Sequence, residues 1–142
     1  MDLLHQKDIK LKSKEFTIAE ANRYLNNGKE TIAKSTIEYG AYTDPKYVSE
    51  GAGIAYLAAL RAIDAFLISR GFPKNKLPKS VDGYFDAIHQ KIPLNGKLST
   101  ALKIAYENLH VFAYYRGGTA VKMIKEGLEN VKKIIEMMDK SI

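Results

Sequence analysis

The stretch from Pro45 to Arg70 constrains the fold more than any other part of the sequence. It opens with Asp44-Pro45, a helix N-cap followed by proline at the first helical position, and it stops at Gly71-Phe72-Pro73. Between these signals, apolar side chains cover nearly the whole circumference of a helix that turns about 100° per residue. Because a helix that is apolar all round is buried in the middle of a bundle, the sequence predicts an all-α fold built around this helix.

Small side chains thin one broad face of this central helix, where another helix could approach closely. They are Gly51, Ala55, Ala58, Ala62 and Ala65. The polar exceptions Glu50, Arg61 and Asp64 fall within one narrow arc of the helix. Together with the apolar surplus on the last helix, the small-residue face leads us to expect self-association, with the homodimer as the expected state.

Capping residues and helix-stopping glycines or prolines outline four further helices. We expect them to run from Thr17 to about Tyr42, from Val81 to about Lys91, from about Lys97 to Arg116, and from Val121 to about Met138. Ser80 and Thr119 are the expected N-caps of the short and the last helix. No strand pattern appears.

The predicted architecture is an up-and-down bundle of four long helices plus one short helix. The prediction treats residues 1–142 as a single helical domain. Within this domain, we expect residues 1–15 to form a flexible or loosely docked N-terminal segment.

Composition excludes several classes of function. The chain of 142 residues contains no cysteine, which removes disulfides, thiolate metal sites and cysteine nucleophiles. The N-terminus lacks the apolar segment of a secretory signal, and the longest apolar run, Ala52 to Leu60, is too short to span a bilayer before Arg61 interrupts it. We therefore expect a cytoplasmic protein with no membrane contact and no cofactor.

The net charge of +6 leaves nucleic-acid binding open without favouring it. The lysines gather near Lys7 to Lys14, Lys74 to Lys79 and Lys122 to Lys133. Acidic residues interleave with the last of these clusters, as on an ordinary solvated surface.

Two pairs have the spacing of metal ligands, Asp86-x-x-His89 and Glu107-x-x-His110. Bundles that hold two metal ions use Glu-x-x-His on two helices, with the ligands pointing inward. On an α-helical projection Glu107 lies about 180°, and His110 about 120°, from the centre of the apolar stripe. Asp86 and His89 are also off their stripe, so we expect no metal site.

Arg116 lies on the apolar stripe of its helix, immediately before Gly117-Gly118. A charge there needs water beyond the helix end or a buried partner, and Arg61 and Asp64 lie similarly in the central helix. We expect a buried polar cluster, structural or ligand-binding, that combines these residues with tyrosines of the same two helices. Its members are Tyr56, Arg61, Asp64, Tyr114, Tyr115 and Arg116, and Tyr106 adds a further hydroxyl nearby in sequence. Loss of Arg116 is expected to lower stability.

The helix order and the stretch "AYLAALRAIDAFLISRG", Ala55 to Gly71, resemble the HEPN superfamily of small bacterial helical bundles. The following "KSVDGYFDAI" and "ALKIAYENLHVFAYYRGG" extend the resemblance over about Lys46 to Met138. The resemblance implies a dimer and, in active members, a metal-independent ribonuclease with an Arg-x4-6-His motif. Arg116 matches the arginine, but the histidine positions hold Val121, Lys122 and Met123. The resemblance therefore implies a diverged member without catalytic residues.

The sequence leaves three functions open. The first is a non-enzymatic bundle that acts through protein association. The second is an RNA-associated protein, either RNA-binding or a weak ribonuclease, which lysines aligned on one exposed face would favour. The third is a small-molecule-binding bundle, which a concave cavity lined by tyrosines would favour.

Overall fold

The computed structural model describes residues 15–142 and has the expected all-α architecture. Its elements are α2 (Ile18–Ile32), β1 (Ile37–Glu38), β2 (Ala41–Tyr42), α3 (Pro45–Ser69), the 3-10 turn η1 (Lys74–Lys76), α4 (Val81–Lys91), α5 (Gly96–Ala105), the π-helix η2 (Tyr106–Tyr115) and α6 (Val121–Ser141). The N-terminal segment predicted over residues 1–15, with its lysine cluster, lies outside the described residues except for Glu15. The expected helix from about Lys97 to Arg116 is the continuous rod formed by α5 and η2.

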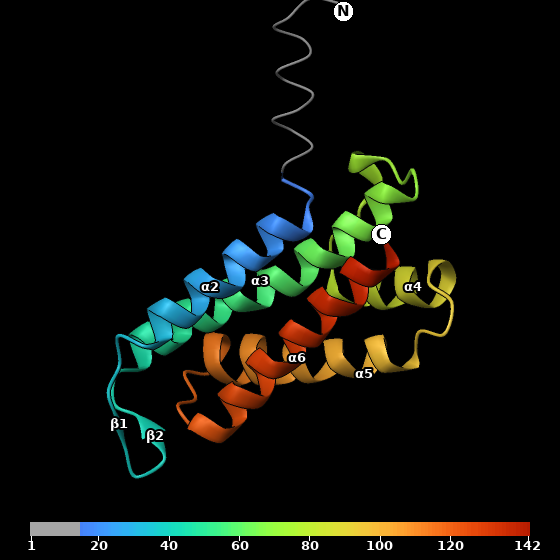
Figure 1. The fold of residues 1–142 in the computed structure, drawn as a ribbon. Coiled ribbons are helices and arrows are strands. Elements are labelled where there is room, and N and C mark those ends of the chain that lie inside the picture. Colours follow the sequence, from blue (N-terminus) through green and yellow to red (C-terminus); the bar gives the residue numbers. More distant parts are fainter. Residues whose placement is uncertain (1–14) are drawn as a thin grey trace, which may run out of the picture.

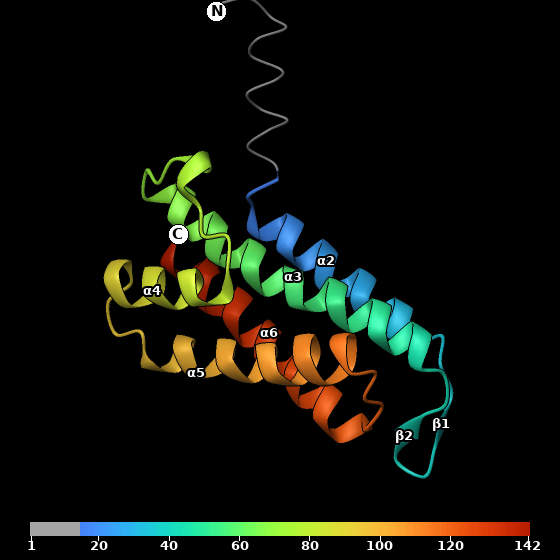
Figure 2. The same cartoon turned by 180° about the vertical axis from the view of Figure 1, so that it is seen from behind.

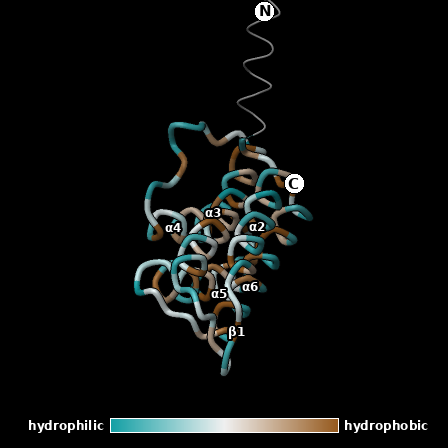
Figure 3. Tube along the Cα trace, turned by 90° about the vertical axis from the view of Figure 1, so that its left-hand side faces the viewer, coloured by the Kyte–Doolittle hydropathy of each residue, from teal (hydrophilic) through white to brown (hydrophobic). Residues whose placement is uncertain are grey.

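The central helix of the bundle is α3, as its all-round apolar sequence predicts. The helix α2 lies along it, and α6 crosses it on the way back from the hairpin end of the molecule (Figure 1). In the described part of the chain, α3 is long and apolar enough to span a membrane, but 67% of its most apolar window is buried inside the fold. Hydrophilic and hydrophobic residues alternate along the surrounding helices, as amphipathic elements with one buried face require (Figure 3).

Glycines set the close approach of α2 to α3. A Cβ added to Gly28 would lie 2.7 Å from the carbonyl oxygen of Gly51, and a Cβ on Gly51 would lie 2.6 Å from that of Gly28. The alanines of α3 at positions 52, 55, 58, 59 and 62 have no exposed surface. The predicted small-residue face is therefore real, but it packs against this chain's own helices and is no free surface for a second copy.

A two-stranded hairpin follows α2, and the prediction of a helix continuing to about Tyr42 without strands is wrong. The helix ends at Ile32, and β1 pairs antiparallel with β2. Tyr39 and Gly40 at the tip have φ of 51° and 75°, the left-handed pair of a type I′ turn. Tyrosine rarely adopts this conformation, so the short hairpin has a weak sequence signal.

The hairpin is anchored to the start of α6 by backbone hydrogen bonds. The N–H of Tyr42 donates to the carbonyl of Thr119, and the N–H of Val121 donates to that of Gly40. The hairpin therefore accepts the hydrogen bond of the first amide of α6. The N-cap residue of α6 is Ala120, which has no side chain that could cap the helix. The expected capping role of Thr119 is wrong for this reason, whereas Ser80 caps α4 by accepting from the N–H of Gly83.

The second half of the α5–η2 rod is a π-helix of 10 residues. Such helices are rare and usually last a single turn, often at functional sites. An i→i+5 ladder turns each residue about 85° instead of about 100°, so η2 rotates its end by roughly a third to a half of a turn relative to an α-helix. The error of an α-helical projection therefore grows along η2: Leu109 is buried as that projection predicts, whereas Arg116 at the far end is exposed.

Candidate functional site: an aromatic groove

Four rings from two helices form a contiguous row on one side of the bundle. Along η2, the ring of His110 stacks on Tyr106 at 5.4 Å and on Tyr114 at 5.6 Å between centroids. Tyr56 of α3 lies beside them, 5.0 Å from His110 and 5.9 Å from Tyr106. Burial, together with the neighbouring Tyr106, raises the pKa of the Tyr56 hydroxyl to about 12.

The π-helix explains why the sequence reading placed His110 elsewhere. The α-helical projection puts it far from the core stripe, whereas in the structure it is half-buried and faces Tyr56 of α3. Residues four apart in an i→i+5 ladder lie roughly one turn apart, so Tyr106, His110 and Tyr114 follow one line along the helix. The spacing of four residues between Tyr106, His110 and Tyr114 is the sequence signal that could have revealed this row.

Packing against α6 and α3 holds η2 in place. A Cβ on Gly127 would lie 2.7 Å from Leu109, so this glycine allows η2 to approach α6 closely. Asn108 is buried, and its Nδ2 donates to the carbonyl of Met123 at 2.9 Å. On the α3 side, the hydroxyl of Ser49 donates to the carbonyl of Tyr114. These contacts fix the row of rings against α3.

The rings border two hollows, and a third hollow adjoins the second; together we call the three the aromatic groove. An apolar hollow of about 310 Å³ lies between α3 and η2 and is lined by Glu50, Gly53, Ile54, Tyr56, Leu57, His110 and Tyr114. A central hollow of about 420 Å³ is lined by Tyr56, Leu60, Pro78, Lys79, Ser80, Val81, Tyr84, Tyr106 and His110. A basic hollow of about 320 Å³ is lined by Leu57, Leu60, Arg61, Asp64, Lys74, Leu77, Pro78, Lys79 and Tyr84. Helix α3 packs against both η2 and α4, and Figure 2 shows α4 and the α5–η2 rod on the same side of α3.

A buried carboxyl lies at the basic end of the groove. Asp64 is 5% exposed, and its Oδ1 accepts a hydrogen bond of 2.9 Å from the hydroxyl of Tyr84. Burial raises the pKa of Asp64 to about 6, against the lowering effects of that hydrogen bond and of the Arg61 charge. Burial and the nearby carboxylate also raise the pKa of Tyr84. Sequence reasoning had not singled out Tyr84.

Arg61 belongs to this end of the groove, but its close contacts are aromatic. Its guanidinium lies 5.7 Å from the ring centroid of Phe16 and 5.6 Å from that of Tyr24. In the described part of the chain it forms no ion pair with Asp64. The two charged residues that α3 contributes to the expected polar cluster thus have separate partners: Arg61 has cation–π contacts, and Asp64 has the hydrogen bond of Tyr84.

The predicted polar cluster is divided by the structure. Tyr56, Arg61, Asp64 and Tyr114 line the groove, although Arg61 and Tyr114 are in different hollows. Tyr115 is 78% exposed and Arg116 is exposed, and neither lines it. The expected burial of Arg116 is wrong because the π-helix rotates the end of the rod away from the core.

Most of the residues with metal-ligand spacing lie on the surface of the bundle. Asp86, His89 and Glu107 are exposed, and His110 takes part in the ring row. Within residues 15–142, no group of three or more histidines, aspartates and glutamates is placed to hold a metal ion.

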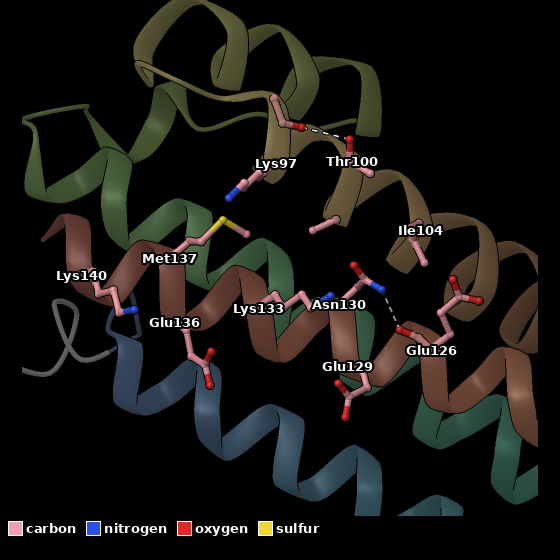
Figure 4. Close-up of a pocket in the computed structure, with 12 residues that line it drawn as sticks. Lys97, Thr100, Ile104, Glu126, Glu129, Asn130, Lys133, Glu136, Met137 and Lys140 are labelled. Carbon is pink, nitrogen blue, oxygen red and sulfur yellow. Dashed lines mark hydrogen bonds between the residues drawn. The ribbon is translucent and has the colours of Figure 1, made fainter.

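A larger hollow of about 870 Å³ lies between α5 and α6 (Figure 4). Three lysines and three glutamates line it, namely Lys97, Lys133, Lys140, Glu126, Glu129 and Glu136. The Nδ2 of Asn130 donates to the carbonyl of Glu126, and the hydroxyl of Thr100 donates to that of Gly96. Because the charges balance and no aromatic ring lines it, this hollow has the character of a solvated surface. The aromatic groove is the better candidate site.

Fold and groove together define a small all-α bundle with a surface site rich in aromatic side chains. The chain belongs to a family described as a domain of unknown function (DUF5618), whose model matches residues 16–140. Among solved structures, it is similar to a protein of unknown function from Dyadobacter fermentans, with 31% sequence identity and a TM-score of 0.77. The likeness covers 88% of this chain and 95% of that one. No curated protein matches the chain.

Proposed function

We propose that this protein works by binding and not by catalysis, and that its binding site is the aromatic groove. The observation that carries the proposal is the row of rings from α3 and η2 around adjoining hollows. Small-ligand sites are concave and mostly apolar, with a few polar groups that orient the ligand. Of the three functions weighed from the sequence, this observation favours the small-molecule-binding bundle.

The surroundings of His110 support a non-catalytic role. A histidine acting as a general base needs a substrate proton within reach, and it is usually oriented by a hydrogen-bonded partner. In the described part of the chain, the contacts of His110 are with three tyrosine rings. Together with the missing histidine after Arg116, this arrangement supports a diverged, HEPN-like bundle without catalytic activity. That the protein is bacterial, cytoplasmic and needs no cofactor remains a proposal from the sequence.

A neutral aromatic probe tests the groove as a binding site. The fluorescence of N-phenyl-1-naphthylamine should rise saturably with the folded protein, and His110→Ala and Tyr106→Leu should each weaken its binding about tenfold, since they remove wall surface of the central hollow. The matched control is His89→Ala, an exposed histidine of α4 outside the groove. Binding that is absent, or that His89→Ala weakens as much as His110→Ala does, would refute the proposal.

Association as a homodimer is the second candidate, and one feature of the hairpin favours it. Tyr39 is fully exposed and has a positive φ, so within this chain it combines backbone strain with an unburied aromatic ring. Ile37 on the same hairpin is 51% exposed, and Tyr115 at the nearby end of η2 is 78% exposed. We propose that the hairpin end is the dimer surface, which a solution mass from light scattering tests.

Nucleic-acid binding has less support. On α6, the exposed lysines alternate with Glu126, Glu129 and Glu136, so no face of this helix carries lysines alone. An RNA oligomer is therefore kept as a competitor in the experiment below.

A further inference from the structure

We infer that the aromatic groove takes a flat aromatic molecule that carries an anionic group. This inference rests on the proposed function and names the ligand class for the same site. The ligand is inferred to be aromatic because of the walls of the central hollow. A space of about 420 Å³ is surrounded there by the rings of Tyr56, Tyr84, Tyr106 and His110. Aromatic side chains gain most from a flat partner that stacks on them or meets them edge to face.

The charges around the groove are polarised along its length. The apolar hollow has one charged residue in its wall, the acidic Glu50. The basic hollow at the opposite end has Arg61, Lys74 and Lys79 in its wall. An anionic group is repelled at the first end and attracted at the second, so the polarity fixes the orientation of the ligand.

Lys79 is the cation available to a ligand. It lines both the central and the basic hollow, and in the described part of the chain its ammonium has no ion pair. The other two cations are engaged: Arg61 lies over two rings, and Lys74 lies 3.5 Å from Glu15 and over Phe16. The acid at this end, Asp64, already accepts the hydrogen bond of Tyr84.

The ligand therefore has its ring among Tyr56, Tyr106 and His110 and its anionic group at Lys79. Both positions border the central hollow, so one small molecule reaches them together. A carboxylate, sulfonate or phosphate satisfies the same geometry, because each accepts hydrogen bonds from an ammonium group.

The test compares two probes that share an aromatic body and differ in charge. 1-Anilinonaphthalene-8-sulfonate should bind about tenfold tighter than neutral N-phenyl-1-naphthylamine, the difference that one charge-assisted hydrogen bond provides. Lys79→Ala should remove this preference, because it should weaken the sulfonate probe about tenfold more than the neutral probe. The matched control Lys103→Ala, an exposed lysine of α5 outside the groove, should preserve it.

The outcomes separate this inference from the proposed function. If both probes bind the wild type equally, or if Lys79→Ala affects the two probes equally, the groove is a binding site but the anionic group is wrong. If neither probe binds, the proposed function fails as well.

Displacement of the sulfonate probe identifies the source of the anion. Displacement by indole-3-acetate supports a carboxylate ligand, and displacement by adenosine monophosphate supports a nucleotide. Displacement by a single-stranded RNA decamer alone, with neither small molecule competing, overturns the inference in favour of a nucleic-acid surface.

Discussion

Asp64 shows at the scale of one residue how burial changes the chemistry of a side chain. Its carboxyl has a pKa of about 6 in the folded chain and an ordinary value of 3.8. The folded state therefore binds this proton more tightly than the unfolded state does. The stability that Asp64 contributes is fully present below pH 3.8, and it is lost as the pH rises through about 6. A shift of about two units corresponds to about 3 kcal/mol.

Asp64→Asn should flatten this pH dependence. The amide oxygen can still accept the hydrogen bond of Tyr84, and the cost of a buried charge at neutral pH disappears, so we expect the free energy of unfolding at pH 7.5 to rise by about 1–2 kcal/mol. Urea unfolding at pH 4.5 and pH 7.5 measures the effect. Asp86→Asn, at an exposed position of α4, is the control. A variant that follows the wild type at both pH values would contradict the buried-charge assignment.

Arg116 illustrates the opposite case, in which a residue expected to be buried is exposed. It is the C-cap residue of η2, and no ion pair or side-chain hydrogen bond engages it in the described part of the chain. Arg116→Ala should therefore change the free energy of unfolding by less than about 0.5 kcal/mol. If Arg116 were one partner of a buried ion pair, its removal would lower that free energy by about 3–5 kcal/mol. Denaturant unfolding distinguishes these values.

At the scale of elements, the bundle depends on glycines where two helices cross. The carbonyl of Gly28 and the side chain of Ile32 leave no room for a methyl group on Gly51. The obstacle is partly backbone, which cannot rotate away as a side chain can. The close pairing of α2 with α3 therefore depends on this position.

Gly51→Ala should destabilise the protein by about 2–3 kcal/mol, even though alanine is the better helix former. Gly96→Ala is the matched control, because it lies at the start of α5 and an added methyl group there meets nothing within 4 Å. We expect that variant to be neutral or slightly stabilised in thermal unfolding. Equal melting temperatures for the two variants would show that α2 and α3 can separate at little cost.

At the scale of the whole molecule, each end of the bundle has one exposed apolar residue with a positive φ. Tyr39 at the hairpin tip and Leu94 between α4 and α5 are both fully exposed and both have positive φ. The hairpin and the α4–α5 connection lie at opposite ends of the bundle (Figure 1). Beside Tyr39, the hairpin also carries the exposed apolar side chain of Ile37.

Replacing each of these residues with asparagine tests the proposed dimer. Asparagine tolerates the left-handed conformation, so both variants should keep or slightly raise thermal stability. Light scattering at micromolar concentration should give a dimer mass for the wild type and for Leu94→Asn, and a lower average mass for Tyr39→Asn. A monomer mass for the wild type across the whole range, or a dimer mass for all three proteins, would rule out the hairpin as the dimer surface.

The sequence by itself determined the helical frame of this protein. Local signals sufficed where capping, punctuation and hydrophobic periodicity agree, as for Asp44-Pro45 at the start of α3 and Ser80 at the start of α4. The all-round apolar pattern of α3 predicted its central position, because burial is the only stable environment for such a helix. The polar arc of α3 also identified Arg61 and Asp64, which line the groove.

The tertiary structure decided the site. The direction of every side chain in η2 depends on a π-helical geometry that is fixed by packing, through Gly127 and Asn108 against α6 and Ser49 against Tyr114. These contacts join segments far apart in the chain, so no local pattern encodes them. The sequence prediction assumed α-helical turns and therefore placed Arg116 in the core and His110 on the outside. The structure shows the reverse, because the small angular difference between α-helical and π-helical turns adds up with every residue along the helix.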